Sequence, residues 1–276
     1  MRLASALATL VFAAGLSLPG PASAQNACAK GKTLKDGVLT VATGNPAYFP
    51  WVIDNKPQSG KGYEAAVAYE VAKRMGFDHD KVVWTTASFD QSIQPGAKEF
   101  DFNLQQFSIT AEREKVVDFS RPYYAAAMAV LVRKSAVEAG ARPTLASLKK
   151  LKFGVVGTTT ALPMIRNLIK PEADPLLYND TADVAQALKS NQIDAGLFDL
   201  PTALYLAAVQ LDDGIVLGQF PADRAERPDL FGLLMAEGNP LKACVDEALE
   251  AMRADGTLQI IEKKWLSENT GVPVIE

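Results

Sequence analysis

The sequence predicts an α/β protein with mostly parallel sheets flanked by helices. Short runs rich in β-branched and aliphatic residues alternate with segments of helical periodicity along most of the 276 residues. Strands that alternate with helices favour parallel pairing, because each helix returns the chain to the same edge of the sheet. The strands also fall into two groups, separated by a polar segment at 138–149 that contains proline and glycine.

The first group of strands surrounds one long predicted helix at 62–77. Its apolar residues Val67, Val71 and Met75 lie on one helical face, and Gly76 is typical of a helix end. The strands expected in this group span 37–43, 81–86, 100–105 and 127–133.

The alternation continues in the second group and ends in another long helix within 239–256. Asn239 is typical of an N-cap, Pro240 of a first helical residue, and Gly256 of a position past a helix end. Strands are expected at 152–157, 176–180, 193–198, 215–220 and 231–235, and further helices near 159–169 and 181–189.

A short internal similarity connects the two groups. Aligning Asp101 with Asp194 brings Gln106 over Asp199, each near the end of a predicted strand. Chance is an open alternative for so short a match. If the similarity is structural, the chain has two like lobes, and ligands bind outside the carboxyl ends of strands in such sheets. Two facing strand ends would then form a cleft.

The N-terminus is predicted to be an export signal. Arg2 precedes an apolar run, and Ala22-Ser23-Ala24 matches an A-x-A cleavage site, so we expect cleavage after Ala24 and a periplasmic product. The net charge of −4 and the lack of a basic stripe argue against a nucleic-acid partner.

Two cysteines and one histidine limit the chemistry. In an oxidising compartment Cys28 and Cys244 can form a disulfide, although Cys244 as a buried thiol is an alternative. The single histidine, His79, lies in a charged turn and is expected to be solvated. Histidine-dependent nucleophilic catalysis is therefore improbable, and we expect neither a metal site nor a cofactor.

Arg113 occupies an unusual place. Ser108 and Thr110 are typical N-cap residues, so Arg113 would lie in the first helical turn, beside the positive end of the helix dipole. Glu112 and Glu114 suit that position, whereas a cation does not. A locally unfavourable residue often marks a site, and the alternative is a solvated arginine paired with its acidic neighbours.

Four segments resemble one protein family. They are "GKGYEAAVAYEVAKRMGF", "SITAEREKVVDFSRPYY", "GVVGTTT" and "IDAGLFDLPTALYLA". Together, in this order, they resemble the polar amino-acid-binding proteins of ABC importers, over most of 33–270. The chain departs from the family at Ala111, where proline is common, at Gln105 and Gln106, where small residues are frequent, and at Gly44, where an acid often stands.

The resemblance implies a two-lobed periplasmic binding protein fold of type II. Residues 33–125 plus 231–276 would form lobe 1 and residues 126–230 lobe 2, after the signal at 1–24. Two crossing strands near 124–128 and 227–231 would act as the hinge.

The resemblance also implies a set of ligand-binding residues. Arg113 would hold the α-carboxylate of an amino acid, and Asp199 its α-ammonium, unless Asp199 only caps the following helix. Ser108 would offer its hydroxyl or main chain and Thr159 its backbone N–H, with helix capping as the alternative for both. The remaining candidates are the main-chain carbonyl of Gln106 and two aromatic walls, Tyr48 and Phe89, which are otherwise core residues.

The implied function is binding rather than catalysis. The lobes would close on an L-amino acid, expected to be polar, and the closed monomer would deliver it to a membrane permease of an ABC importer. The alternative is an exported cyclohexadienyl or arogenate dehydratase on the same fold. Such an enzyme needs a general acid, for which Glu64 and Asp199 are the candidates.

Overall fold

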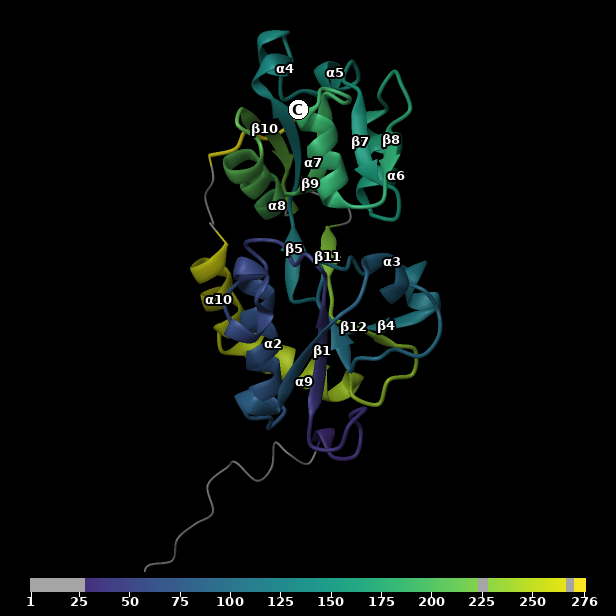
Figure 1. Ribbon diagram of the computed structural model, residues 1–276, viewed down its shortest axis with the longest axis vertical. Coiled ribbons are helices and arrows are strands. Elements are labelled where there is room, and N and C mark those ends of the chain that lie inside the picture. Colours follow the sequence, from purple (N-terminus) through teal and green to yellow (C-terminus); the bar gives the residue numbers. More distant parts are fainter. Residues whose placement is uncertain (1–27, 223–227, 267–270) are drawn as a thin grey trace, which may run out of the picture.

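The computed structural model describes residues 28–222, 228–266 and 271–276. The predicted signal at 1–24 lies outside these residues. The chain forms two lobes joined by a narrow waist, one above the other in Figure 1. Within the described ranges, no helix combines the length and the apolar character needed to cross a membrane.

The first lobe contains a five-stranded sheet in the order β2-β1-β3-β12-β4. β1 pairs in parallel with β2 and β3, whereas β12 pairs antiparallel with β3 and β4. The strands are β1 (Leu39–Thr43), β2 (Val82–Thr86), β3 (Phe102–Asn103), β4 (Val117–Phe119) and β12 (Leu234–Ala236).

The second lobe repeats this plan in the order β10-β6-β9-β7-β8. β7 pairs in parallel with β8 and β9, and β6 pairs antiparallel with β9 and β10. The strands are β6 (Met128–Arg133), β7 (Phe153–Val156), β8 (Leu176–Tyr178), β9 (Ala195–Asp199) and β10 (Gly214–Phe220).

Both sheets are mixed, as four strands of each run in one direction and one strand, β12 or β6, runs opposite to them. The expectation of mostly parallel sheets therefore holds for four of the five strands in each lobe. The reason for the opposed strand lies in the crossings. β6 and β12 each follow a crossing between lobes, so the chain enters at the carboxyl end of its parallel neighbours and runs opposite to them. The crossings themselves are β5 (Tyr124–Ala126) and β11 (Asp229–Phe231), which pair antiparallel at the waist (Figure 1).

Helices cover the faces of both sheets. The lower lobe of Figure 1 carries α2 (Tyr63–Arg74), α3 (Phe89–Ser92), α9 (Lys242–Ala254) and α10 (Thr257–Trp265). The upper lobe carries α4 (Lys134–Glu138), α5 (Leu145–Leu148), α6 (Ala161–Met164), α7 (Thr181–Lys189) and α8 (Leu200–Tyr205). α6 and α8 continue as π-helical turns over Ile165–Ile169 and Leu206–Gln210, and short 3₁₀ turns occupy Ile53–Asn55, Pro57–Ser59, His79–Lys81 and Arg113–Lys115.

Two predicted helix starts differ from the structure. The helix expected after Ser108 is a single 3₁₀ turn, because Thr110 accepts the Arg113 N–H at 3.2 Å while Ser108 pairs with hinge residue Phe231. α9 begins at Lys242 rather than at Pro240, although the Asn239 side chain accepts the Leu241 N–H at 2.8 Å.

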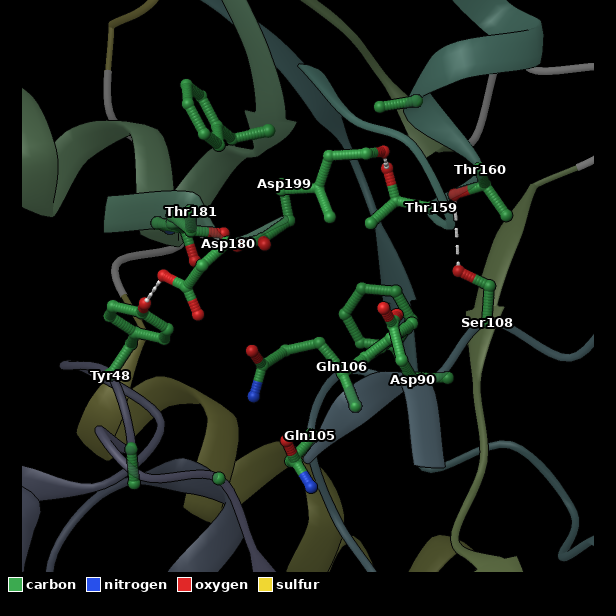
Figure 2. A pocket seen from close by; sticks show the side chains of 18 of the residues that line it. Tyr48, Asp90, Gln105, Gln106, Ser108, Thr159, Thr160, Asp180, Thr181 and Asp199 are labelled. Atoms are coloured by element: carbon green, nitrogen blue, oxygen red, sulfur yellow. Dashed lines mark hydrogen bonds between the residues drawn. The ribbon is translucent and has the colours of Figure 1, made fainter. Parts of the chain in front are cut away.

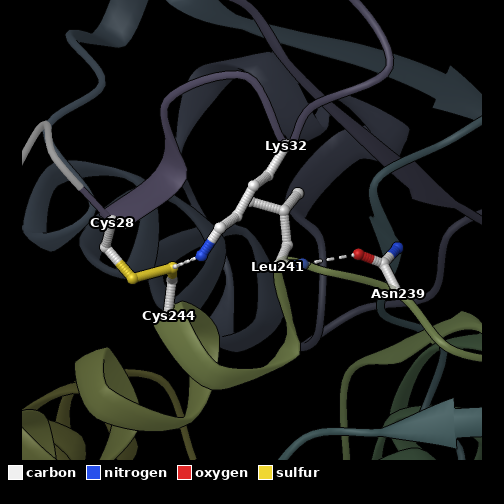
Figure 3. Close-up of a disulfide and its surroundings, with 5 residues drawn as sticks. All are labelled: Cys28, Lys32, Asn239, Leu241 and Cys244. Carbon is white, nitrogen blue, oxygen red and sulfur yellow. Dashed lines mark hydrogen bonds between the residues drawn. A yellow bond between two sulfur atoms is a disulfide. The ribbon is translucent and has the colours of Figure 1, made fainter.

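The two chain ends of the described protein lie on different lobes. Cys28 and Cys244 form a disulfide, with Cα atoms 5.8 Å apart, which fixes the N-terminal segment to α9 (Figure 3). Residues 271–276 instead pack on the second lobe, where Ile275 is buried in the core and Gln219 donates to the Pro273 carbonyl at 2.8 Å. The assignment of all of 231–276 to the first lobe therefore fails for this tail.

Candidate ligand-binding cleft

A cavity of about 390 Å³ lies between the lobes and has the size of a small-molecule site. Its walls come from the carboxyl ends of strands in both sheets, since Gln106 follows β3, Asp180 follows β8 and Asp199 ends β9. All seven residues predicted to bind the ligand line this cavity: Tyr48, Phe89, Gln106, Ser108, Arg113, Thr159 and Asp199. Figure 2 shows Ser108 and Thr160 at one end, Tyr48 and Asp180 at the other, and Gln106 between them.

Arg113 is buried, with 9% of its surface exposed, so it is not a solvated arginine. One terminal nitrogen donates to the Ser108 carbonyl at 2.8 Å, and the other donates to the Thr158 carbonyl of the second lobe at 2.9 Å. The guanidinium lies 5.2 Å from the ring centre of Phe89. Burial lowers its pKa, and the charge of Asp229 opposes that shift. Among the described residues, no carboxylate lies within ion-pair distance of Arg113.

Asp199 has two roles in the structure. Its carboxylate accepts the Thr202 N–H at 2.9 Å and so caps α8, and the same residue lines the cavity. Desolvation by burial raises its pKa to about 6, although the hydrogen bonds from Thr202 act in the opposite direction. Within the described chain it has no basic partner, so the cavity holds an unpaired cation from one lobe and an unpaired anion from the other.

Thr159 differs from its expected role. Its backbone N–H and its hydroxyl both point to the Val156 carbonyl, at 3.2 and 2.9 Å, so that N–H is already used. The neighbouring Thr160 contacts the waist and the first lobe: its hydroxyl donates to Asp229 of β11 at 2.8 Å and lies 3.3 Å from the Ser108 hydroxyl.

Gln106 is held by a buried carboxylate. The residue has a left-handed backbone, with φ of 51°, which is unfavourable for a side chain other than glycine. Its N–H donates to Glu64 Oε1 at 2.7 Å and its side-chain amide donates to Glu64 Oε2, and these bonds offset the strain. Glu64 is 1% exposed and also accepts the Tyr123 hydroxyl. Burial raises the pKa of Glu64 to about 7.

The aromatic candidates have separate surroundings. Tyr48 is half-buried and donates its hydroxyl across the cleft to Asp180 at 2.5 Å. Phe89 stacks on the core residue Phe107, with ring centres 4.7 Å apart, and its ring also contacts the Arg113 guanidinium. Trp51, assigned to the core, is fully buried, and its indole N–H reaches Thr202 of the second lobe at 3.0 Å.

The sequence reasoning missed several wall residues that reach across the cleft. Asp180 and Thr202 were not nominated, and neither was Asp90, which accepts the Thr158 hydroxyl at 2.7 Å. Asp180 had a usable signal, because it follows a predicted strand and precedes a predicted helix, and ligands bind at such strand ends. Asp90 and Thr202 lie inside helices, where sequence pattern alone gives no such signal.

The sequence matches the family of bacterial extracellular solute-binding proteins, family 3, over residues 39–268. The L-cystine-binding protein TcyJ of Escherichia coli K12 is 32% identical over 239 residues, which span 85% of this chain and 84% of that protein. The match therefore extends over both lobes and the waist.

Solved structures of similar chains have the same fold. An ancestral arginine-binding protein bound to glutamine aligns with a TM-score of 0.68 and 27% identity, over 85% of this chain and all of the other. An ancestral amino acid-binding protein, described as a precursor of cyclohexadienyl dehydratase, aligns with a TM-score of 0.65 and 28% identity, over 84% of this chain and 96% of that one. The two-lobed fold of a type II periplasmic binding protein is thus shared across these chains.

Proposed function

Because this chain belongs to the bacterial extracellular solute-binding proteins of family 3, we propose that it captures an L-amino acid for an ABC importer. Its relatives carry names for cystine binding and for arginine binding, and one is bound to glutamine. The shared part of such ligands is the α-ammonium and α-carboxylate, so the proposal concerns these two groups first.

One observation carries the proposal: the cavity combines a buried, unpaired Arg113 from the first lobe with an unpaired Asp199 from the second. A guanidinium binds a carboxylate through two parallel hydrogen bonds, and a carboxylate in a closed cleft needs a cation to offset its desolvation. A zwitterion would satisfy both at once. Ser108 would contribute its hydroxyl, and Gln106 its main-chain carbonyl, next to these charges.

The ligand would also act as a bridge between lobes. Tyr48, Trp51 and Arg113 already reach residues of the second lobe, so the structure has the contacts of a closed cleft. A ligand held by Arg113 and Asp199 together favours this closed form, because it makes fewer contacts in an open one. The closed protein would then dock on a membrane permease. We further propose that it acts as a periplasmic monomer, released from its signal after Ala24.

The proposal is tested by calorimetric titration of the refolded mature protein against the twenty L-amino acids. We expect one-to-one binding by one or a few of them, and no binding by the corresponding amines that lack the carboxylate. The absence of binding by every α-amino acid would remove the basis of the proposal.

A dehydratase on the same fold is the second candidate, since a precursor of such an enzyme is a structural neighbour. The pKa of Glu64, about 7, suits a general acid. Its position does not, because Glu64 is 1% exposed and both of its oxygens are engaged by Gln106 and Tyr123. Incubation with prephenate and arogenate separates the two: turnover supports the enzyme, and binding without turnover supports the importer.

A further inference from the structure

The charges around the cavity are unequal. Among the described residues that line it, Arg113 is the only basic one. Its acidic wall residues are Glu64, Asp90, Asp180, Asp199 and Asp229. The α-ammonium and α-carboxylate of a bound amino acid would pair with Asp199 and Arg113. The other four acidic residues of the wall would then remain without a cationic partner on the ligand. The chemistry of these remaining wall residues therefore indicates which kind of ligand side chain the cavity accepts.

Asp180 is the acceptor at the end of the cavity away from Ser108 (Figure 2). Its Oδ1 accepts both the Tyr48 hydroxyl at 2.5 Å and the Ala182 N–H at 2.7 Å. In the parts of the chain that the structure describes, its Oδ2 receives no hydrogen bond and no basic side chain lies within ion-pair distance. Asp180 is also the N-cap of α7.

Gln105 presents a second acceptor whose orientation is fixed. Its side-chain nitrogen lies 2.9 Å from the Ala87 carbonyl and 3.1 Å from the Asn103 side-chain oxygen. A backbone carbonyl only accepts hydrogen bonds, so the nitrogen must face Ala87 and the amide oxygen must face the opposite way. That oxygen lies against Gly44, where an added Cβ would approach it to 2.9 Å, and both residues line the cavity.

Gln106 has the same polarity. The side-chain nitrogen of Gln106 faces the Glu64 carboxylate. The side-chain oxygen therefore faces away from Glu64, on the cavity side. Figure 2 shows the side chains of Gln105, Gln106 and Asp180 on the side of the cavity away from Ser108 and Thr160. This half of the cavity thus offers two amide oxygens and one carboxylate oxygen, and the Tyr48 hydroxyl proton is already donated to Asp180.

We propose that the ligand is an L-amino acid with a cationic side chain, whose ammonium or guanidinium is received by Asp180, Gln105 and Gln106. This inference rests on the proposed function, which places the α-carboxylate on Arg113. A carboxylate on the ligand's side chain would instead face the oxygens of Asp180, Gln105 and Gln106. The described wall has no further basic residue to pair with it. A side chain with several N–H donors satisfies these acceptors and reduces the surplus negative charge.

The test compares ligands of equal shape and different charge. L-Arginine is titrated against L-citrulline, its neutral isostere, and L-lysine against L-norleucine, with L-glutamate as the acidic ligand. We expect the cationic member of at least one pair to bind at least about tenfold more tightly than its neutral partner, as for hydrogen bonds to charged groups. L-Glutamate should bind more weakly than both members of that pair.

The variant Asp180→Asn locates the effect. It keeps the N-cap and removes the charge, so the preference for the cation should fall by about 1.5-fold to fivefold, the range for a solvent-accessible charge pair. Asp183→Asn is the matched control, since Asp183 lies on the same first turn of α7 but not on the cavity wall. The Asp183→Asn variant should keep the preference of the unmodified protein for the cationic ligand.

Two results would overturn the inference. One is equal or tighter binding of the neutral or acidic amino acids, which would leave the proposed function intact. The other is an equal loss of preference in both aspartate variants, which would reduce the effect to the overall charge of the lobe. Failure of every α-amino acid to bind would instead overturn the proposed function, and this inference with it.

Discussion

The two lobes share one plan and differ in what they bring to the cleft. In each lobe an aspartate before a cleft-facing strand accepts an N–H from the beginning of the neighbouring strand. Asp101 accepts the Thr40 N–H at 2.6 Å, and Asp194 accepts the Lys152 N–H at 2.9 Å. The corresponding strand pairs, β1 with β3 and β7 with β9, are both parallel. The short internal similarity in the sequence therefore has a structural basis.

The difference begins where these two strands end. In the second lobe the position is Asp199, which lines the cavity and is only partly buried. In the first lobe it is Gln106, and the carboxylate is one layer deeper, on Glu64 of α2. The first lobe thus presents the cation Arg113 to the cavity, and the second presents the anion Asp199. Similar lobes can in this way supply opposite charges to one ligand, because the strand end is a carboxylate only in the second lobe, and the first lobe adds Arg113 from a separate 3₁₀ turn.

The largest effect is expected from removing the charge of the first lobe. Arg113→Ala would leave a bound carboxylate without a partner in a buried site, which costs about 3–5 kcal/mol for a broken buried pair. That cost corresponds to a loss of affinity of more than about hundredfold. Calorimetry on the variant measures it, with thermal unfolding to show that the fold persists.

Arg121→Ala is the matched control, because that arginine is exposed and pairs with Glu250 away from the cavity. Its affinity should equal that of the unmodified protein. Unchanged affinity in Arg113→Ala would show that the first lobe does not supply the cation.

The next effect concerns how each lobe holds its chain end. The first lobe uses a covalent link between Cys28 and Cys244, and the second uses non-covalent packing of Ile275. Cys28→Ser with Cys244→Ser should lower the free energy of unfolding by about 2–4 kcal/mol, because the open chain gains entropy when unfolded. Urea unfolding measures the loss.

Ligand affinity should stay unchanged in that double variant, since neither cysteine lines the cavity. Ile275→Ala gives the comparison for the second lobe, where deleting a buried side chain costs about 2–4 kcal/mol. Equal stability of the reduced and oxidised proteins would mean that the link adds nothing to the first lobe.

A third prediction concerns the buried carboxylate of the first lobe. Because burial raises the pKa of Glu64 from 4.5 to about 7, the folded protein binds the proton more tightly than the unfolded chain does. Its contribution to stability is therefore complete below pH 4.5 and is lost as the pH rises through 7. Between pH 5 and pH 8 the loss should be about 2 kcal/mol. Urea unfolding at both values measures it.

Glu64→Gln should remove this pH dependence, because glutamine does not titrate. Glu70→Gln is the control on the same helix, where the carboxylate pairs with Arg74 and is not buried in the same way. An identical pH dependence in Glu64→Gln and in the unmodified protein would assign the effect to another group.

The sequence was informative wherever a local pattern determines the structure. Alternating strands and helices and the strand-end positions of Gln106 and Asp199 follow from periodicity and from the internal similarity, whereas the two crossings were expected only from the family resemblance. The one opposed strand in each sheet, β6 or β12, was not predicted, because its direction comes from the crossings, which no local pattern encodes.

The details of the site depend on contacts between distant residues. The use of the Thr159 N–H by Val156 and the reach of Asp180 to Tyr48 are fixed only when loops and lobes meet. Glu64 illustrates the same limit, since its sequence position on an amphipathic helix gives no indication that Gln106 would cover it. The family resemblance therefore identified the walls of the cavity better than it identified the hydrogen bonds within them.

The smallest effect is expected from titrating the charge of the second lobe. Burial raises the pKa of Asp199 to about 6 in the free protein, and a bound ammonium would lower it again. Binding should thus release a proton below pH 6, and affinity should fall by about tenfold from pH 7 to pH 5 as Asp199 becomes protonated. Asp199→Asn should bind weakly and show no such slope, whereas Asp90→Asn, on the same cavity wall, should retain it. A slope that persists in Asp199→Asn would move the ammonium partner to another carboxylate, and the second lobe would then lose the role that distinguishes it from the first.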